Sequence, residues 1–229
     1  KYFMKKIKKY LDQQLGGNKN TLLLLSVGIL YALVTFRMIY SSKLYYLFLI
    51  WNTFLAVLPY VISEYDVRCK SSKYKTIVLC FLTILFLPNA LYLISDFEHL
   101  AERPPVPFFF DILLMFYASM LGLLFNVLAI RNIHKTILHY LKPKTANKLI
   151  AFIIILSGFG VYLGRYLRWN SWDIITHPKT LLLDCIYHSL HPNLFGYTWA
   201  VSIGYAFVLG FGYLLFRQTE QLIQQDNKN

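Results

Sequence analysis

Polar side chains of the kinds that do chemistry recur at helical spacing inside otherwise apolar segments. Four of them follow one another at intervals of three, four and three residues: Asn89, Tyr92, Asp96 and His99. A helix would carry these four as one stripe on a single face. Asp96 could then orient His99 as a general base. With Asp111 or Asp173, the same two side chains could bind a divalent metal, although an Asp-x-x-His pattern also arises by chance.

Arginines close a later apolar segment and suggest a different kind of chemistry. Arg165 and Arg168 follow Gly160 and Gly164, a pair of small residues that permits close contact between helices. The planar guanidinium fork is suited to phosphate or carboxylate groups. We therefore predict that both arginines bind an anion. Four further residues are expected to position or bind a substrate: Asn52, Asn89, Asn170 and Asp173.

The elements that hold these residues are predicted to be transmembrane helices. The chain has 229 residues, of which 57% are hydrophobic, and its mean hydropathy is +0.47, too apolar for a soluble domain of this length. Its apolar residues form blocks of about 20, the length that crosses a bilayer as a helix. Six blocks are expected at 21–40, 44–63, 74–95, 107–130, 147–167 and 194–216. The prediction is an all-α integral membrane bundle of six transmembrane helices.

The basic residues predict the orientation of this bundle. Of the 23 Lys and Arg residues, seventeen fall on the side that holds both termini and six on the other. An excess of Lys and Arg marks cytoplasmic segments, so both termini are predicted to be cytoplasmic. Residues 1–20 would form a basic arm, 21–217 the transmembrane domain and 218–229 a polar tail. The expected partner is the lipid bilayer, with anionic headgroups against the arm, and not a nucleic acid.

This orientation brings the polar residues to a common depth near the outer surface. Asn52, Asn89, Asp96, Asp111, Arg165 and Arg168 all fall there, with Arg37 near the outer end of the first helix. Only Asn126 is expected towards the cytoplasmic side, where His134 and His139 are interpreted as ordinary loop residues. Charged residues inside a membrane are costly and often functional. Two interpretations stay open: an outward-facing polar pocket, or an internal network pairing Asp96 or Asp111 with Arg165 or Arg168.

Smaller features complete the predicted topology. The external segment 168–193 contains a semi-apolar piece, 180–190, which is predicted to form a short helix in the interface plane. The three cysteines fall at different depths and show no metal-binding spacing, so no disulfide is expected. No P-loop, nucleophile elbow, dinucleotide fingerprint or His-Glu-x-x-His motif is present.

Several segments carry a resemblance to a known family. These are the Trp-Asn-x-Phe-Leu-Ala run at 51–56, the Pro-Asn-Ala run from Pro88 to Leu100, and the long run from Gly160 to Asp173, with Asp111 opening a helix between them. Over roughly residues 25–215 the chain resembles an uncharacterised bacterial membrane family, domain of unknown function 1361. The resemblance implies a multi-pass protein of the bacterial inner membrane, and it implies no particular reaction.

The leading expectation is a membrane-embedded enzyme or binding protein that handles an anionic or lipid-linked substrate. Asp96, His99 and Asp111 would be catalytic, and the arginines would hold the anion. The alternatives are an ion or solute transporter or channel, and a structural or accessory membrane subunit. The sequence does not specify the substrate, the oligomeric state or whether a metal is bound.

Overall fold

Six long helices make up most of the chain in a computed structural model that describes residues 19–69, 72–191, 193 and 196–226. They are α2 (Lys19–Ser41), α3 (Phe48–Cys69), α4 (Lys73–Ser95), α5 (Phe108–Tyr140), α6 (Pro143–Arg165) and α9 (Gly196–Asp226). Shorter helices are η1 (Asp96–His99), α7 (Asp173–Thr176) and α8 (Pro178–Leu190). All six long helices are long and apolar enough to cross a membrane. The predicted all-α bundle of six transmembrane helices is confirmed.

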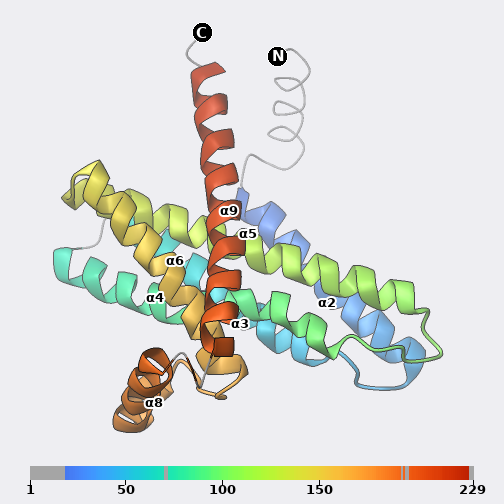
Figure 1. Cartoon of the computed structure of the whole chain (residues 1–229). Coiled ribbons are helices and arrows are strands. Elements are labelled where there is room, and N and C mark those ends of the chain that lie inside the picture. The colour runs from blue at the N-terminus through green and yellow to red at the C-terminus, as the bar shows by residue number, and fades with distance from the viewer. Residues whose placement is uncertain (1–18, 70–71, 192, 194–195, 227–229) are drawn as a thin grey trace.

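Helices α4 and α5 lie at the centre of the bundle, between two apolar cores (Figure 1). One core joins them to α2 and α3 through side chains such as Leu30, Leu49 and Met115. The other joins them to α6 and α9 through side chains such as Val161 and Leu209. Helices α2 and α3 therefore pack on one side of α4 and α5, and α6 and α9 pack on the other. Neighbours in sequence that are also neighbours in space are usual in helical bundles with short connections.

The outer surface of the bundle is rich in large apolar side chains. Leu24, Ile39 and Phe207 are 71%, 74% and 70% exposed, and many other large apolar side chains also face outward. In water such a surface would drive aggregation, whereas hydrocarbon solvates it. The distribution supports a bilayer as the surroundings of these helices.

Glycines occur where neighbouring helices lie too close together for a larger side chain. A Cβ added at Gly160 would lie 2.4 Å from the ring of Pro88, and one at Gly158 would lie 2.1 Å from the carbonyl oxygen of Ser202. At Gly164 it would overlap the hydroxyl of Tyr92. The close helix contact predicted from Gly160 and Gly164 is therefore present, and it joins α6 to α4.

Three helices continue well past the predicted ends of their apolar blocks. Helix α3 extends to Cys69, α5 to Tyr140 and α9 to Asp226, so most of the predicted loops 64–75 and 131–148 are helix. Their charged residues pair between helices, as Arg131 of α5 does with Glu220 of α9. The end of an apolar run is therefore not the end of the helix. Of the predicted basic arm, all but the last two residues lie outside the described part.

The predicted short helix is present as α8, which contains the segment 180–190. None of its residues is buried, and Figure 1 shows it set apart from the long helices, at the opposite end of α9 from the C-terminus. All three cysteines are free.

Candidate functional site

One end of the bundle gathers most of the residues singled out in the sequence. It contains the C-terminal ends of α2, α4 and α6 and the N-terminal ends of α3, α5 and α9. We call it the predicted outer end, after the orientation expected from the basic residues. Two groups of charged residues lie there, and their surroundings differ.

Arg37 and Asp111 form the first group, which we call the sealed pair. The Arg37 guanidinium donates to the carboxylate through Nε (2.9 Å) and Nη2 (2.8 Å), and both side chains are completely buried. Nη1 donates to Ser41 Oγ at 3.2 Å. The guanidinium lies over the rings of Tyr45 and Tyr46, 5.2 and 4.9 Å from their centres. The charges of this ion pair neutralise each other, and its hydrogen bonds and ring contacts are made by groups inside the protein.

The position of the sealed pair follows from the helix ends that carry it. Arg37 lies in the last turns of α2 and Asp111 in the first turn of α5, where the helix dipoles favour a cation and an anion respectively. Arg103, on the segment before α5, covers the same two tyrosines, at 4.6 Å from Tyr45 and 5.1 Å from Tyr46. The pair is therefore covered by aromatic rings and by a second arginine.

The second group, which we call the open cluster, consists of Asp96, Glu98, Arg165 and Asn52. Asn52 donates to Asp96 Oδ2 at 2.8 Å, and Arg165 Nη2 lies 3.2 Å from Asp96 Oδ1. Arg165 Nη2 also donates to the Ser95 carbonyl at 2.7 Å. Arg165 Nε lies 3.6 Å from a Glu98 oxygen, which is an ion-pair contact without a hydrogen bond. Asp96 is completely buried, whereas the Glu98 side chain is 51% exposed.

The hydrogen bonding of the open cluster is incomplete. Two of its buried atoms, Asp96 Oδ1 and Arg165 Nε, have no hydrogen-bond partner. Buried polar atoms are nearly always paired, and an unpaired one costs about 1 to 3 kcal/mol. Unlike the sealed pair, the open cluster retains hydrogen-bonding capacity that the protein itself does not use.

Tyrosines border the open cluster on its exposed side. Tyr166 donates to Glu98 Oε1 at 2.9 Å and lies 3.1 Å from the hydroxyl of Tyr197. Burial, with added effects of Tyr197 and the Glu98 carboxylate, raises the pKa of Tyr166 above its ordinary value of 10.0. Tyr166 therefore remains a protonated donor over the whole neutral range.

Arg168 lies just beyond the end of α6 and is exposed. Its φ is +62°, a conformation that favours glycine, and the turn around it is closed by the Trp169 N–H donating to the Leu163 carbonyl at 3.1 Å. Among the described residues, no side chain forms a hydrogen bond or an ion pair with Arg168. Residues held in sparsely populated backbone conformations often lie at functional sites.

His99 is exposed beside the open cluster, at the end of η1. Its ring packs edge-on against Phe48, with the ring centres 5.2 Å apart. The Arg103 side chain donates to the His99 carbonyl at 3.3 Å. His99 is therefore accessible from outside, one turn beyond Asp96.

The remaining predicted site residues have local partners. Asn89 donates to Ser171 Oγ at 3.1 Å, which ties α4 to the segment after α6. The Asn170 N–H donates to Asp173 Oδ2 at 2.7 Å, and the Thr176 hydroxyl donates to Oδ1 at 2.9 Å. The Asn170 N–H is the main cause of a lowered pKa of Asp173. These contacts shape the loop that carries Arg168.

The structure brings together part of the predicted site. The ion pair of Asp96 with Arg165, one of those considered from the sequence, is present, and Asn52 joins it. Asp111 pairs instead with Arg37, and so belongs to a separate group. Within the described ranges, no three His, Cys, Asp or Glu side chains are grouped so that they could hold a metal ion.

The sequence interpretation missed a buried polar group at the opposite end of the bundle. His134 is 4% exposed and lies in α5, not in a loop, and Asn132, Glu64 and Asp66 are also buried there. His134 follows the buried Asn126 by eight residues, close to two helical turns, so a continuing helix would place the two near one face. That signal was available, but the prediction ended the helix before the charge of Arg131.

The fold and its buried charges define a multi-pass helical membrane protein with buried polar groups at both ends of its bundle. A family model described as "Protein of unknown function (DUF1361)" matches residues 51–211, and the chain belongs to this family. Searches of curated proteins and of solved structures found no match.

Proposed function

We propose that this protein, in a bacterial inner membrane, binds an anionic group at the open cluster, with Arg165 and Arg168 as its ligands. The observation that carries the proposal is the unused capacity of these two arginines. Arg165 has a buried Nε without a hydrogen-bond partner, and Arg168, three residues further along the chain, is exposed in strained backbone. A phosphate or carboxylate would accept from both guanidinium groups. Glu98, exposed and 3.6 Å from Arg165, is the group that such an anion would replace.

The other predicted residues receive roles consistent with their contacts. Asp96 orients Arg165 and is itself held by Asn52. His99 is the candidate acid or base, since it is exposed one turn away. Asn89, Asn170 and Asp173 act through the loop that carries Arg168. Asp111 serves the sealed pair and so stabilises the fold.

The location favours a substrate that is partly in the membrane. Arg165 ends the apolar span of α6, and Arg168 follows within one turn. An anion there would lie at the boundary between headgroups and hydrocarbon, so a lipid-linked phosphate fits better than a soluble anion. Binding alone and binding followed by reaction both agree with this geometry.

A transporter is the second candidate, supported by the buried polar group at the opposite end. The predicted inner half of the bundle is less apolar than expected, because four polar residues are buried there: Glu64, Asp66, Asn132 and His134. A polar route through the bundle would need such residues. A flux assay in liposomes separates the two functions: movement of an ion or solute down its gradient would favour the transporter.

The direct test compares phosphatidic acid with diacylglycerol of the same chains, using the purified protein in detergent and isothermal titration calorimetry. We expect phosphatidic acid to bind at least about tenfold more tightly, because only it carries the anion. Arg165→Gln and Arg168→Gln should each abolish the phosphatidic acid binding event at the open cluster and leave any binding elsewhere on the bundle unchanged. Lys179→Gln, an exposed cation on α8, is the matched control and should change nothing. Equal binding of the two lipids would overturn the proposal.

A further inference from the structure

A groove between α6 and α9 has a volume of about 750 Å³. Its walls are almost entirely apolar and include Ile154, Ile155, Trp199, Ile203, Phe207 and Leu214. Small residues, among them Ala151, Ala206 and Gly210, leave the space open. Trp199 and Arg217 mark the ends of the lining along α9. They are about 27 Å apart at 1.5 Å per residue, close to the ~30 Å thickness of the hydrocarbon core.

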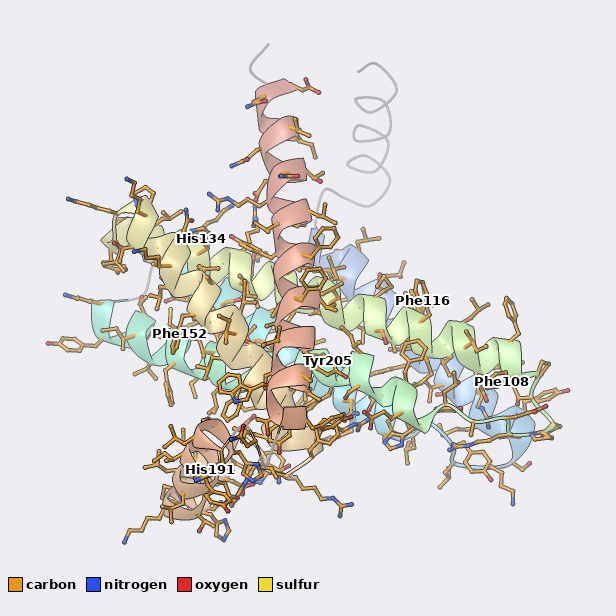
Figure 2. The ribbon with its side chains drawn as sticks, viewed as in Figure 1. Phe108, Phe116, His134, Phe152, His191 and Tyr205 are labelled. Carbon is orange, nitrogen blue, oxygen red and sulfur yellow. The ribbon has the colours of Figure 1, made fainter. Side chains whose placement is uncertain are left out.

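One end of this groove is polar. His134, Asn147, Tyr213 and Arg217 line it, and Arg217 Nη1 donates to Asn147 Oδ1 at 3.2 Å. His134 reaches this place from α5, and its Nδ1 is hydrogen-bonded to the Tyr213 hydroxyl of α9. Figure 2 shows His134 on α5 near the crossing of α9. The polar end lies at the predicted inner end of the bundle, away from the open cluster.

His134 Nε2 is the atom that points to a ligand. The residue is 4% exposed, and Nε2 has no hydrogen bond of ordinary geometry, although Asn147 lies near the ring. When the Tyr213 hydroxyl donates to Nδ1, the ring proton is on Nε2, which becomes a buried donor. Arg217 adds a positive charge to the same end of the groove. An anionic oxygen would satisfy both donors.

We propose that this groove binds an anionic glycerophospholipid. Its phosphate would lie at Arg217 and His134, and one acyl chain would follow the apolar walls between α6 and α9. Three observations select this occupant: an apolar groove open to the surroundings of the helices, a length close to the hydrocarbon thickness, and a cationic end with a buried donor. The polar end is also on the side with most Lys and Arg residues, where anionic headgroups are attracted. This site is separate from the open cluster and does not depend on its function.

The test measures lipid binding by native mass spectrometry of the purified protein, with phosphatidylglycerol and phosphatidylcholine titrated in parallel. We expect one phosphatidylglycerol to bind about tenfold or more tightly than phosphatidylcholine, since only its headgroup is anionic. Arg217→Gln should reduce this preference about tenfold, and His134→Gln should reduce it by a smaller factor. Ala151→Phe, which fills the groove, should weaken the binding of both lipids.

Matched variants control for charge, size and the other site. Lys142→Gln removes an exposed cation at the same end, and Ile77→Phe enlarges an exposed apolar residue of α4 outside the groove. Arg165→Gln disables the open cluster. All three should bind phosphatidylglycerol as the unmodified chain does, and circular dichroism melting should show that every variant is folded. Equal binding of both lipids, or an unchanged preference in Arg217→Gln, would overturn the proposal. Dimerisation that Ala151→Phe abolishes would assign the groove to a second copy of the chain and also overturn it.

Discussion

The sealed pair and the open cluster each contain an Asp–Arg ion pair at the same end of the bundle, but they differ in burial and in hydrogen bonding. In each, an aspartate completely buried at a helix end meets an arginine from another helix. In the sealed pair the arginine is also 0% exposed and forms two hydrogen bonds to the carboxylate. In the open cluster the arginine is 17% exposed and its Nε has no hydrogen-bond partner.

The neighbouring residues account for this difference. The sealed pair is covered by Tyr45 and Tyr46, with Arg103 on the same rings. Over the open cluster lies Glu98, which is half exposed and binds Arg165 only loosely. An ion pair fully enclosed by its own protein has no capacity left for a ligand, whereas a partly paired one does. The sealed pair therefore fits the structural network considered from the sequence, and the open cluster is where we propose the polar pocket.

The largest expected effect comes from breaking the sealed pair. Asp111→Asn leaves the Arg37 charge buried without its carboxylate, which should lower the free energy of unfolding by about 3 to 5 kcal/mol. Asp96→Asn should cost clearly less, because Arg165 is partly exposed and also donates to the Ser95 carbonyl. Denaturant unfolding in detergent micelles, followed by tryptophan fluorescence, measures both.

A double variant separates charge from packing at the sealed pair. Arg37→Met with Asp111→Leu removes both charges together and should recover most of the stability lost in Asp111→Asn. If Asp96→Asn were instead as destabilising as Asp111→Asn, the distinction between a sealed and an open group would be wrong.

The second effect should be a gain of binding. Glu98 competes with an incoming anion for Arg165, so Glu98→Gln should raise the affinity for phosphatidic acid, by up to about tenfold. Glu102→Gln removes an exposed carboxylate from the same connecting segment and is the control. Calorimetric titration compares the two variants. A weaker affinity in Glu98→Gln would show that the carboxylate takes part in binding and does not compete.

The third effect distinguishes a functional from a structural role for Arg168. Its φ of +62° suits glycine, so Arg168→Gly should stabilise the fold by up to about 1 kcal/mol while it weakens anion binding. Ser42, with a φ of +50°, is the matched control: Ser42→Gly should stabilise the fold similarly and leave binding unchanged. Thermal melting and calorimetry give the two readouts. Unchanged binding in Arg168→Gly would remove this residue from the proposed site.

The sequence was sufficient for the helices and for the end of the bundle at which most of the predicted site residues gather, because both follow from the length of apolar runs. It could not give lateral neighbours: Asp111 was considered a partner for Arg165 or Arg168, yet α5 lies beside α2 and so Asp111 meets Arg37. Hydropathy also ended the long helices too early, since it does not register charges that pair between helices. His134 was therefore assigned to a loop, and the groove beside it was not foreseen.

The smallest effect concerns Asp173. Unlike the aspartates of the sealed pair and the open cluster, it is hydrogen-bonded mainly to residues close to it in sequence. The Asn170 N–H lowers the pKa of Asp173 below its ordinary value of 3.8. A lowered folded pKa means that the ionised form favours the fold, so its contribution is complete above the ordinary pKa and is lost as the pH falls through the folded pKa. The amide of Asn170 should therefore lose hydrogen-exchange protection only in strong acid, and Asp173→Asn should show the weaker protection already at neutral pH. Thr176→Val, which keeps the Asn170 contact, is the control and should retain most of the protection. Equal protection of Asn170 in Asp173→Asn and in the unmodified chain would show that this carboxylate does not hold the loop, and its role beside Arg168 would then have to be a direct one.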